Sequence, residues 1–195
     1  MTPPAVIVGG DGVARCAWSD GSDDYRDYHD QEWGRAVHGD TALFERITLE
    51  AFQSGLSWLT ILRKREGFRA AFAQFDPHVV AAYGDTDVTR LMADAGIVRN
   101  RRKIDATVTN ARALLRMQAE SGVGALDAVF WSSRPAADRP RPRTYADIPS
   151  TTPESTALSK VLKAQGFVFV GPTTMYAAMQ ACGVVDDHAE GCHRA

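Results

Sequence analysis

The stretch LMADAGIVRNRRKIDATVTNARALL, residues 91–115, predicts two helices joined by a very short turn. Asn100 is a suitable N-cap for the second helix, and Gly96 suits the left-handed position that ends the first. Apolar residues recur at helical spacing after the turn, at Ile104, Val108, Ala111 and Leu115. This periodicity places them on one buried face. The stretch therefore predicts a helical hairpin.

The residues before this hairpin predict three more helices. A helix with an apolar face should begin with Asp40 or Thr41 as its N-cap and end near Gly55, and a second helix should start at Ser57. A third, short helix should follow Asp76 with Pro77 as its first residue, because proline is favoured at that position.

The residues after the hairpin predict two helices and little else. Pro153 should open the helix in STTPESTALSKVLKAQG, and Thr173 should cap the helix in GPTTMYAAMQACG, with Cys182 on its buried stripe. One apolar run is typical of a strand, FVFV at residues 167–170, and one short run cannot form a sheet. The predicted fold class is therefore all-α, without internal repeats.

Size and composition predict an ordinary globular protein. The 195 residues are 45% hydrophobic, enough for one domain or two small lobes, with residues 1–14 as a loose tail rich in proline and glycine. No run of about 18 apolar residues and no basic start followed by an apolar stretch is present, so we expect a cytoplasmic protein without membrane contact. The stretch VIVGGDG lacks the spacing of a dinucleotide-binding loop, and no organic cofactor is expected.

The charge is small in total but uneven in distribution. The formal net charge is -2, which argues against non-specific coating of nucleic acid. Residues 63–65, 99–103 and 134–143 nevertheless hold 11 of the 22 basic side chains. Each stretch taken alone has the features of a solvated surface, and the arginine- and proline-rich stretch 134–143 receives no functional role.

Cysteine and histidine residues near both chain ends suggest a metal site. His188 and Cys192 stand four residues apart, and Cys16 and His29 form a complementary pair near the other end. Four such ligands would make a closed tetrahedral site for a structural Zn²⁺ that ties the chain ends together. Three alternatives stay open: three ligands and a water, which would permit hydrolase chemistry; His193 as a competing ligand; and an exposed tail without metal.

A carboxylate and four aromatic residues form the second group of interest. Glu50 lies at the edge of an apolar helix face, in LEAFQSGLSW, where it is either solvated or buried with a partner. The aromatic residues are Trp18, Tyr28, Trp33 and Trp58. Aromatic faces stack on nucleobases and attract cations, although tryptophans are also common in protein cores.

Several long segments, in order, resemble those of the DNA-3-methyladenine glycosylase I family of helix-hairpin-helix base-excision enzymes. They are RCAWSD, YHDQEWG, LEAFQSGLSWLTILRKRE, DAGIVRNRRKI, FVFVGPTTMYAAMQACGVVDDH and HAEGC, and they extend from about Arg15 to Cys192. The resemblance implies a single glycosylase domain over residues 15–195, with two helical lobes, the hairpin at about residues 91–115 and a structural zinc.

The resemblance also assigns residues. Cys16, His29, His188 and Cys192 match the family's zinc ligands. Glu50 and Tyr28 match catalytic and base-recognising residues, and Trp18, Trp33 and Trp58 match residues that line the base pocket. The implied partner is alkylated duplex DNA, with the protein acting as a monomer that hydrolyses the N-glycosidic bond of 3-methyladenine after base flipping and does not nick the strand.

Candidate contacts to DNA follow from the hairpin. Backbone N–H groups of the turn at Gly96 and the side chains of Arg99, Arg101, Arg102 and Lys103 would hold a phosphate. Leu56 is either a wedge that fills the gap left by the flipped nucleotide or an ordinary residue at a helix entry. Asp127, the one acid in the region where many relatives carry a catalytic aspartate, is interpreted as structural.

Two other classes of protein compete with the glycosylase. The first is a non-catalytic, zinc-stabilised binder of damaged DNA that keeps the pocket and the hairpin. The second is a zinc hydrolase or deaminase, which needs an open metal position that a four-ligand site does not provide.

Overall fold

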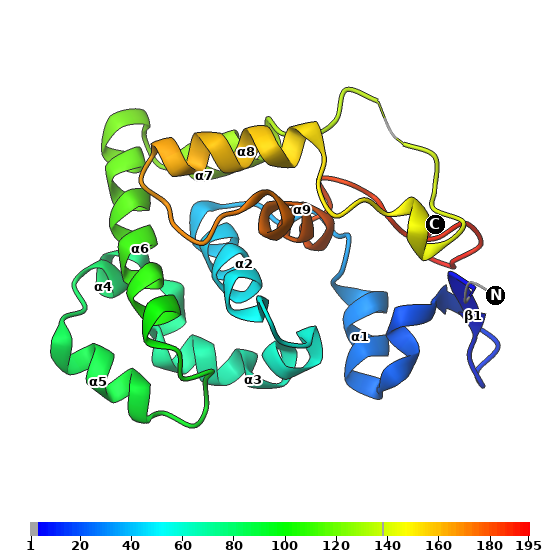
Figure 1. The fold of residues 1–195 in the computed structure, drawn as a ribbon, viewed down its shortest axis with the longest axis horizontal. Coiled ribbons are helices and arrows are strands. Elements are labelled where there is room, and N and C mark those ends of the chain that lie inside the picture. The colour runs from blue at the N-terminus through cyan, green and yellow to red at the C-terminus, as the bar shows by residue number, and fades with distance from the viewer. Residues whose placement is uncertain (1–3, 138) are drawn as a thin grey trace.

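The protein is mostly helical, with a small two-stranded hairpin at one end (Figure 1). The computed structural model describes residues 4–137 and 139–195. The elements are β1 (Val6–Val8), β2 (Ala14–Cys16), η1 (Ala17–Gly21), α1 (Asp23–Gln31), α2 (Asp40–Gln53), α3 (Trp58–Ala71), η2 (Ala73–Phe75), α4 (Pro77–Ala81), α5 (Asp85–Ala93), α6 (Arg101–Ser121), α7 (Ala125–Trp131), η3 (Tyr145–Asp147), α8 (Pro153–Ala164) and α9 (Pro172–Ala181).

Helix α2 is the centre of the main core. It contacts α3, α6, α7 and α9, and α8 packs on α9. Its apolar residues Leu43, Phe44, Ile47 and Phe52 are fully buried. Burial of such side chains stabilises the fold by about 1.5–3 kcal/mol each, so this helix holds the other helices in place.

The N-terminal and C-terminal segments meet at the end of the molecule that carries β1, near α1 (Figure 1). A second, small cluster of buried side chains joins them: Ala5, Cys16, Ala189 and Cys192. A backbone hydrogen bond from His193 N to Ala14 O, at 2.8 Å, also ties the two segments, and one from Ala17 N to Ala5 O closes the N-terminal segment on itself.

Most predicted helix starts are confirmed by their caps. Asn100 accepts from Lys103 N at the start of α6, and Ser57 accepts from Thr60 N at the start of α3. Pro77 and Pro153 are the first residues of α4 and α8. Short side chains that cap their own helix are local signals, which is why the sequence predicts them well.

Helices α2 and α7 cap each other, which the sequence did not predict. Asp40 is the first residue of α2, not its cap, and its carboxylate accepts from the backbone N of Gly124 and Asp127 at the start of α7. Asp127 in turn accepts from Gly39 N, before α2. Each carboxylate thus satisfies backbone donors of the other helix, and this agrees with a structural role for Asp127.

Two expectations about strands are wrong. Residues 4–14 are not a loose tail, because β1 pairs antiparallel with β2 and Val6 lies opposite Cys16; residues 1–3 of that predicted tail are outside the described residues. The fold is therefore all-α apart from this hairpin. The run FVFV forms no strand: the side chain of Asn110 on α6 bonds both Val168 N and Val168 O, and Phe169 has a φ of 57°.

The turn between α5 and α6 spans residues 94–100 and differs from the prediction at Gly96. Gly96 is not in the left-handed conformation; α5 ends at Ala93 with Asp94 as its C-cap. A Cβ at Gly67 on α3 would lie 2.5 Å from Gly96 O. The close approach of α3 to the backbone of this turn therefore requires a residue without a side chain at position 67. Likewise Thr173 is not the cap of α9, because Pro172 is already its first residue and Gly171 the N-cap.

Candidate functional site

The base-binding residues predicted from the sequence line one cavity of about 210 Å³. Trp18, Tyr28, Trp33, Glu50 and Trp58 all contribute to its wall. They come from η1, α1, the segment after α1, α2 and α3, so the packing of α1 against α3 closes the cavity. A cavity of roughly 150 Å³ accepts benzene, and this one has room for a larger flat ring system.

The aromatic side chains contact one another around the cavity. The ring centroids of Trp18 and Trp33 are 5.2 Å apart and nearly perpendicular, and those of Tyr28 and Trp58 are 5.3 Å apart. The indole Nε1 of Trp58 is buried and has no hydrogen-bond partner in the described residues. The cavity thus offers flat apolar faces and at least one unused donor, which suits a planar polar ligand.

Glu50 is the buried carboxylate of the cavity. It is 6% exposed, and the described part of the chain supplies no hydrogen bond to its carboxylate. Burial raises its pKa to about 8, while the charge of Arg46 lowers it. An unpaired buried carboxylate is costly, so Glu50 is a group whose hydrogen-bonding capacity is available to a ligand.

Tyr28 faces the same space from α1. It is 3% exposed, and burial, followed by the charge of Glu50, raises its pKa well above the usual value, so the hydroxyl is neutral and can donate. The backbone O of Tyr28 accepts from both Glu32 N and Trp33 N, each at 2.9 Å. The end of α1 therefore fixes Tyr28 and Trp33 relative to each other.

The sequence did not predict four residues of the cavity wall: Gln53, Ile148, Ala177 and Gln180. Gln53 lies one turn after Glu50 on α2, and this spacing was a usable signal. Gln180 donates from Nε2 to Asp187 Oδ2 at 2.8 Å, and Arg139 and Tyr176 bond the same carboxylate. No feature of the neighbouring sequence indicates that Ile148 or the residues of α9 belong to the cavity wall, because they reach it only through tertiary packing.

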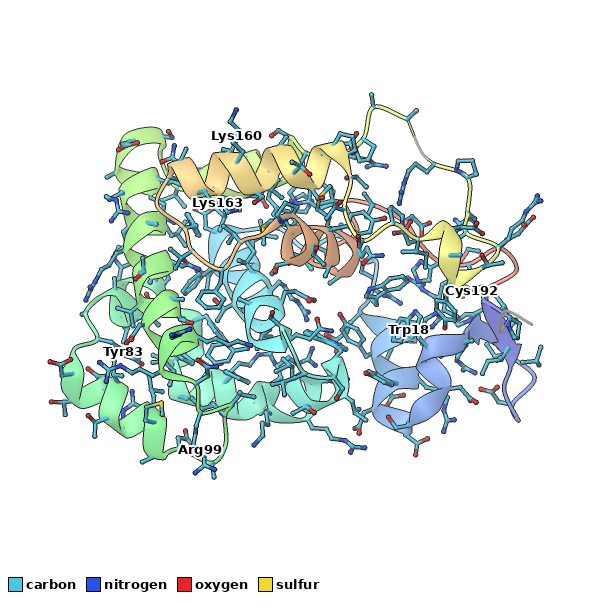
Figure 2. The ribbon with its side chains drawn as sticks, in the orientation of Figure 1. Trp18, Tyr83, Arg99, Lys160, Lys163 and Cys192 are labelled. Carbon is cyan, nitrogen blue, oxygen red and sulfur yellow. The ribbon has the colours of Figure 1, made fainter. Side chains whose placement is uncertain are left out.

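Cys192, one of the predicted metal ligands, lies at the end of the molecule that also holds Trp18 (Figure 2). The ligand atoms of Cys16, His29 and Cys192 all lie within 4.8 Å of one another, and His29 Nε2 is 3.4 Å from Cys192 Sγ. His188 is not within that distance of all three, but its ring centroid is 5.3 Å from that of His29.

The hydrogen bonds around this cluster engage the Nδ1 atoms of both histidines, and His29 Nε2 accepts a long bond from Cys16 N at 3.4 Å. His29 Nδ1 pairs with Asp30 at 2.8 Å and His188 Nδ1 with Asp186 at 2.7 Å, which directs each Nε2 inward. His188 Nε2 is buried without a partner in the described residues. The sulfurs of Cys16 and Cys192 accept from backbone N–H groups at 3.3 and 3.4 Å. Carboxylates behind histidine ligands are typical of zinc sites.

The competing ligand His193 is already engaged. Its Nδ1 bonds Ala14 O at 2.9 Å, and its Nε2 lies 3.4 Å from Asp30. His29, Asp30 and His193 form a second group with suitable spacing, but it lies toward the surface.

Most predicted DNA contacts lie on the exposed turn between α5 and α6 and at the start of α6. Gly96, Arg99, Arg101 and Arg102 are exposed, and the side chain of Arg99 projects outward (Figure 2). Lys103 is different: it is 7% exposed. Its Nζ donates to Phe52 O at 2.8 Å and to Ser54 O at 2.7 Å, so its ammonium group is not available to a phosphate.

Leu56 lies in the loop between α2 and α3, between the cavity residues Gln53 and Trp58 in the sequence. It is 42% exposed, in a turn closed by a bond from its N to Gln53 O, and the preceding Gly55 has a φ of 84°. Lys103 anchors the carbonyl of Ser54, two residues before Leu56. The loop thus presents an apolar side chain on a fixed backbone.

In residues 4–137 and 139–195, no helix has the length and apolar character that a membrane crossing requires.

The cavity, the buried carboxylate and the cysteine–histidine cluster define a helical protein with a purine-sized aromatic site. The chain belongs to the methyladenine glycosylase family, whose family model matches residues 18–195. It is 48% identical to DNA-3-methyladenine glycosylase 1 of Escherichia coli over 180 residues, which are 92% of this chain and 96% of that protein. It is 45% identical to DNA-3-methyladenine glycosylase of Haemophilus influenzae over 183 residues, 92% and 97% of the two chains.

Solved structures agree with this assignment. A crystal structure of 3-methyladenine DNA glycosylase I superposes with a TM-score of 0.86 at 47% identity, and covers 92% of this chain and 98% of that one. The Staphylococcus aureus enzyme, in a structure that addresses 3-methyladenine recognition, superposes with a TM-score of 0.84 at 34% identity over 92% and 95% of the two chains. The predicted family and enzyme class are therefore confirmed.

Proposed function

We propose that this protein removes 3-methyladenine from alkylated duplex DNA by hydrolysis of the N-glycosidic bond. The observation that carries the proposal is the cavity itself, in which aromatic faces surround the buried carboxylate of Glu50. The family and the relatives named for 3-methyladenine support the same substrate. A base inside a duplex cannot reach such a cavity, so the nucleotide has to be flipped out of the stack.

The substrate chemistry matches what the cavity offers. N3-methylated adenine is cationic while it is attached to the sugar, so it is already a good leaving group and needs little help from a general acid. Trp18, Trp33 and Trp58 supply faces that attract a cationic base. Glu50 accepts hydrogen bonds from the amino edge of adenine, and the Tyr28 hydroxyl donates one.

In the reaction, the bond between C1′ and N9 breaks and its electron pair stays on the base, which leaves neutral. The oxygen of a water molecule forms the new bond to C1′ and loses a proton to solvent. No lysine lines the cavity in the described residues, so no amine is placed to form a Schiff base. We therefore expect base release without strand nicking.

We propose that the turn between α5 and α6 is a helix-hairpin-helix element that binds a DNA phosphate. The exposed Gly96, Arg99, Arg101 and Arg102 support this role. Phosphate contacts of this kind position a protein without reading sequence. Lys103 contributes indirectly, by holding the loop that carries Leu56, the proposed wedge.

We also propose a structural Zn²⁺ bound by Cys16, His29, His188 and Cys192. Two sulfurs and two imidazole nitrogens are the donor set of closed zinc sites, and the unpartnered Nε2 of His188 supports His188 over His193. Bound there, the ion would fasten β2 and α1 to the C-terminal segment. Because Trp18 and Tyr28 neighbour these ligands in sequence, the ion would also steady one wall of the cavity. The predicted monomeric state, cytoplasmic location and two-lobed domain stay predictions.

The decisive experiment is to incubate the protein with methylated duplex DNA and identify the released bases by chromatography. We expect 3-methyladenine with little 7-methylguanine, and weaker release by Glu50→Gln and Trp58→Ala. Glu45→Gln on the same helix and Trp131→Phe, away from the cavity, are the matched controls. No release by a folded, zinc-loaded sample would contradict the proposal.

The damage-binding alternative predicts a different result in the same samples. It requires retained affinity for methylated duplex DNA without any base release. The zinc hydrolase alternative predicts that a cobalt-substituted sample changes its absorption when small anions are added, whereas a closed site of four protein ligands should not respond.

A further inference from the structure

Arg46 is a largely buried cation next to Glu50 of the cavity wall. It lies one helical turn before Glu50 on α2, a spacing at which side chains are neighbours. Its side chain is 15% exposed, and its Nη2 donates to Glu32 Oε2 at 3.1 Å. Its Nη1 is buried and has no hydrogen-bond partner in the described residues. Part of this guanidinium is therefore not engaged by the ion pair that anchors it.

The ion-paired group formed by Arg46, Arg65 and Glu32 carries a net positive charge. Arg65 from α3 already binds Glu32 with both nitrogens, Nη1 to Oε2 at 2.6 Å and Nη2 to Oε1 at 2.8 Å. Two arginines thus share the one carboxylate of Glu32. When Glu50 is ionised, the four groups carry no net charge, and when it is protonated a positive charge is left over next to it.

The other groups that face Glu50 do not supply this charge. From α1 the facing group is the Tyr28 hydroxyl, and after α9 it is the Cys182 thiol, whose pKa burial raises to about 12. From α3 it is Trp58, which carries no charge. The Lys103 ammonium on α6 is held by the carbonyls of Phe52 and Ser54. Burial raises the pKa of Glu50, and the charge that opposes burial is that of Arg46.

We propose that Arg46 is a positioning residue for base recognition: anchored on Glu32, its guanidinium supplies the counter-charge that favours the carboxylate form of Glu50. This inference rests on the base-recognising role proposed above for Glu50. An ionised carboxylate only accepts hydrogen bonds, and the amino edge of an adenine presents a donor. A protonated Glu50 would keep only one freely accepting oxygen and would lose the negative charge that attracts a cationic base. Arg46 thereby extends the pH range over which the cavity accepts an adenine.

The first test measures the charge of Glu50 in the free protein, without any substrate. The side-chain carboxyl of Glu50 is followed by ¹³C NMR against pH and assigned by its absence in Glu50→Gln. Arg46→Met and Arg46→Gln remove the charge, and the glutamine variant keeps a donor for Glu32 if the methionine variant folds poorly. Both should move the titration of Glu50 up by roughly one pH unit or more.

The controls separate charge from packing. Arg46→Lys keeps the charge and should return the midpoint close to that of the unmodified protein. Arg69→Met removes another partly buried arginine, which ties α3 to Glu45 on α2, and should leave the midpoint unchanged. Identical midpoints in the unmodified protein and both neutral variants would overturn the proposal.

The second test measures 3-methyladenine release. The acid limb of the pH profile of kcat/KM, which reports on the free enzyme, should move upward in the neutral variants and recover in Arg46→Lys. Below the midpoint, each pH unit of displacement corresponds to a tenfold lower kcat/KM. An unchanged profile in active neutral variants would contradict the role of Arg46. If neither the unmodified protein nor any variant releases the base, the proposed function is wrong. The NMR titration still shows in that case whether Arg46 favours the ionised form of Glu50.

Discussion

The burial of Glu50 predicts that replacing it by glutamine stabilises the protein at high pH. Its pKa rises from 4.5 to about 8 on folding, because burial disfavours the charged form more than Arg46 favours it. The folded state therefore holds the proton more tightly than the unfolded state, and stability is lost as pH rises from about 4.5 through about 8. Glutamine has nearly the same shape and no such titration. Each unit of pKa shift corresponds to about 1.4 kcal/mol of unfolding free energy. The unmodified protein therefore loses about 5 kcal/mol at high pH that the glutamine variant does not lose.

The assay is urea unfolding of the unmodified protein and of Glu50→Gln at pH 5 and at pH 8.5, with the same excess of zinc. Other titrating groups act equally on both proteins and cancel in the difference. We expect a small difference at pH 5 and a stabilisation of the variant by several kcal/mol at pH 8.5. Glu45→Gln, on the same helix, should show no such trend. Parallel stability curves for the unmodified protein and Glu50→Gln would refute the reasoning, since Glu50 would then titrate alike in both states.

Three further outcomes are expected. Chelation of the proposed zinc, or Cys16→Ser, should lower the unfolding free energy by about 4 kcal/mol or more and Tm by about 10 °C in calorimetry, whereas Cys182→Ala, a core change, should keep one zinc per chain. Lys103→Met leaves the carbonyls of Phe52 and Ser54 without their donor and should cost about 1–3 kcal/mol in urea unfolding; a cost no larger than that of Arg102→Met would argue against the anchor. Gly67→Ala places a Cβ 2.5 Å from Gly96 O and should cost about 1–3 kcal/mol, while Gly10→Ala, with open space around it, should change little.

The sequence alone determined the helices whose signals are local. Asn100, Ser57 and Thr152 cap α6, α3 and α8 with their own side chains, and apolar spacing marked the buried faces. The sequence also contained the residue types of the site. All five predicted base-binding residues line one cavity, and three of the four predicted metal ligands gather within 4.8 Å, because the segments that resemble the family carry these residues.

Tertiary structure decided what depends on contacts between distant segments. Asp40 and Asp127 cap each other's helices across 87 positions of sequence, and Lys103 holds carbonyls about 50 positions away, so a residue predicted to bind phosphate serves the backbone instead. Ala177 and Gln180 enter the cavity only because α9 packs on α2. The charge relation of Arg46, Glu32 and Glu50 likewise exists only in the folded protein. Caps and apolar periodicity act within a few residues, whereas burial, charge pairing and cavity shape arise from the packing of elements that the sequence places far apart.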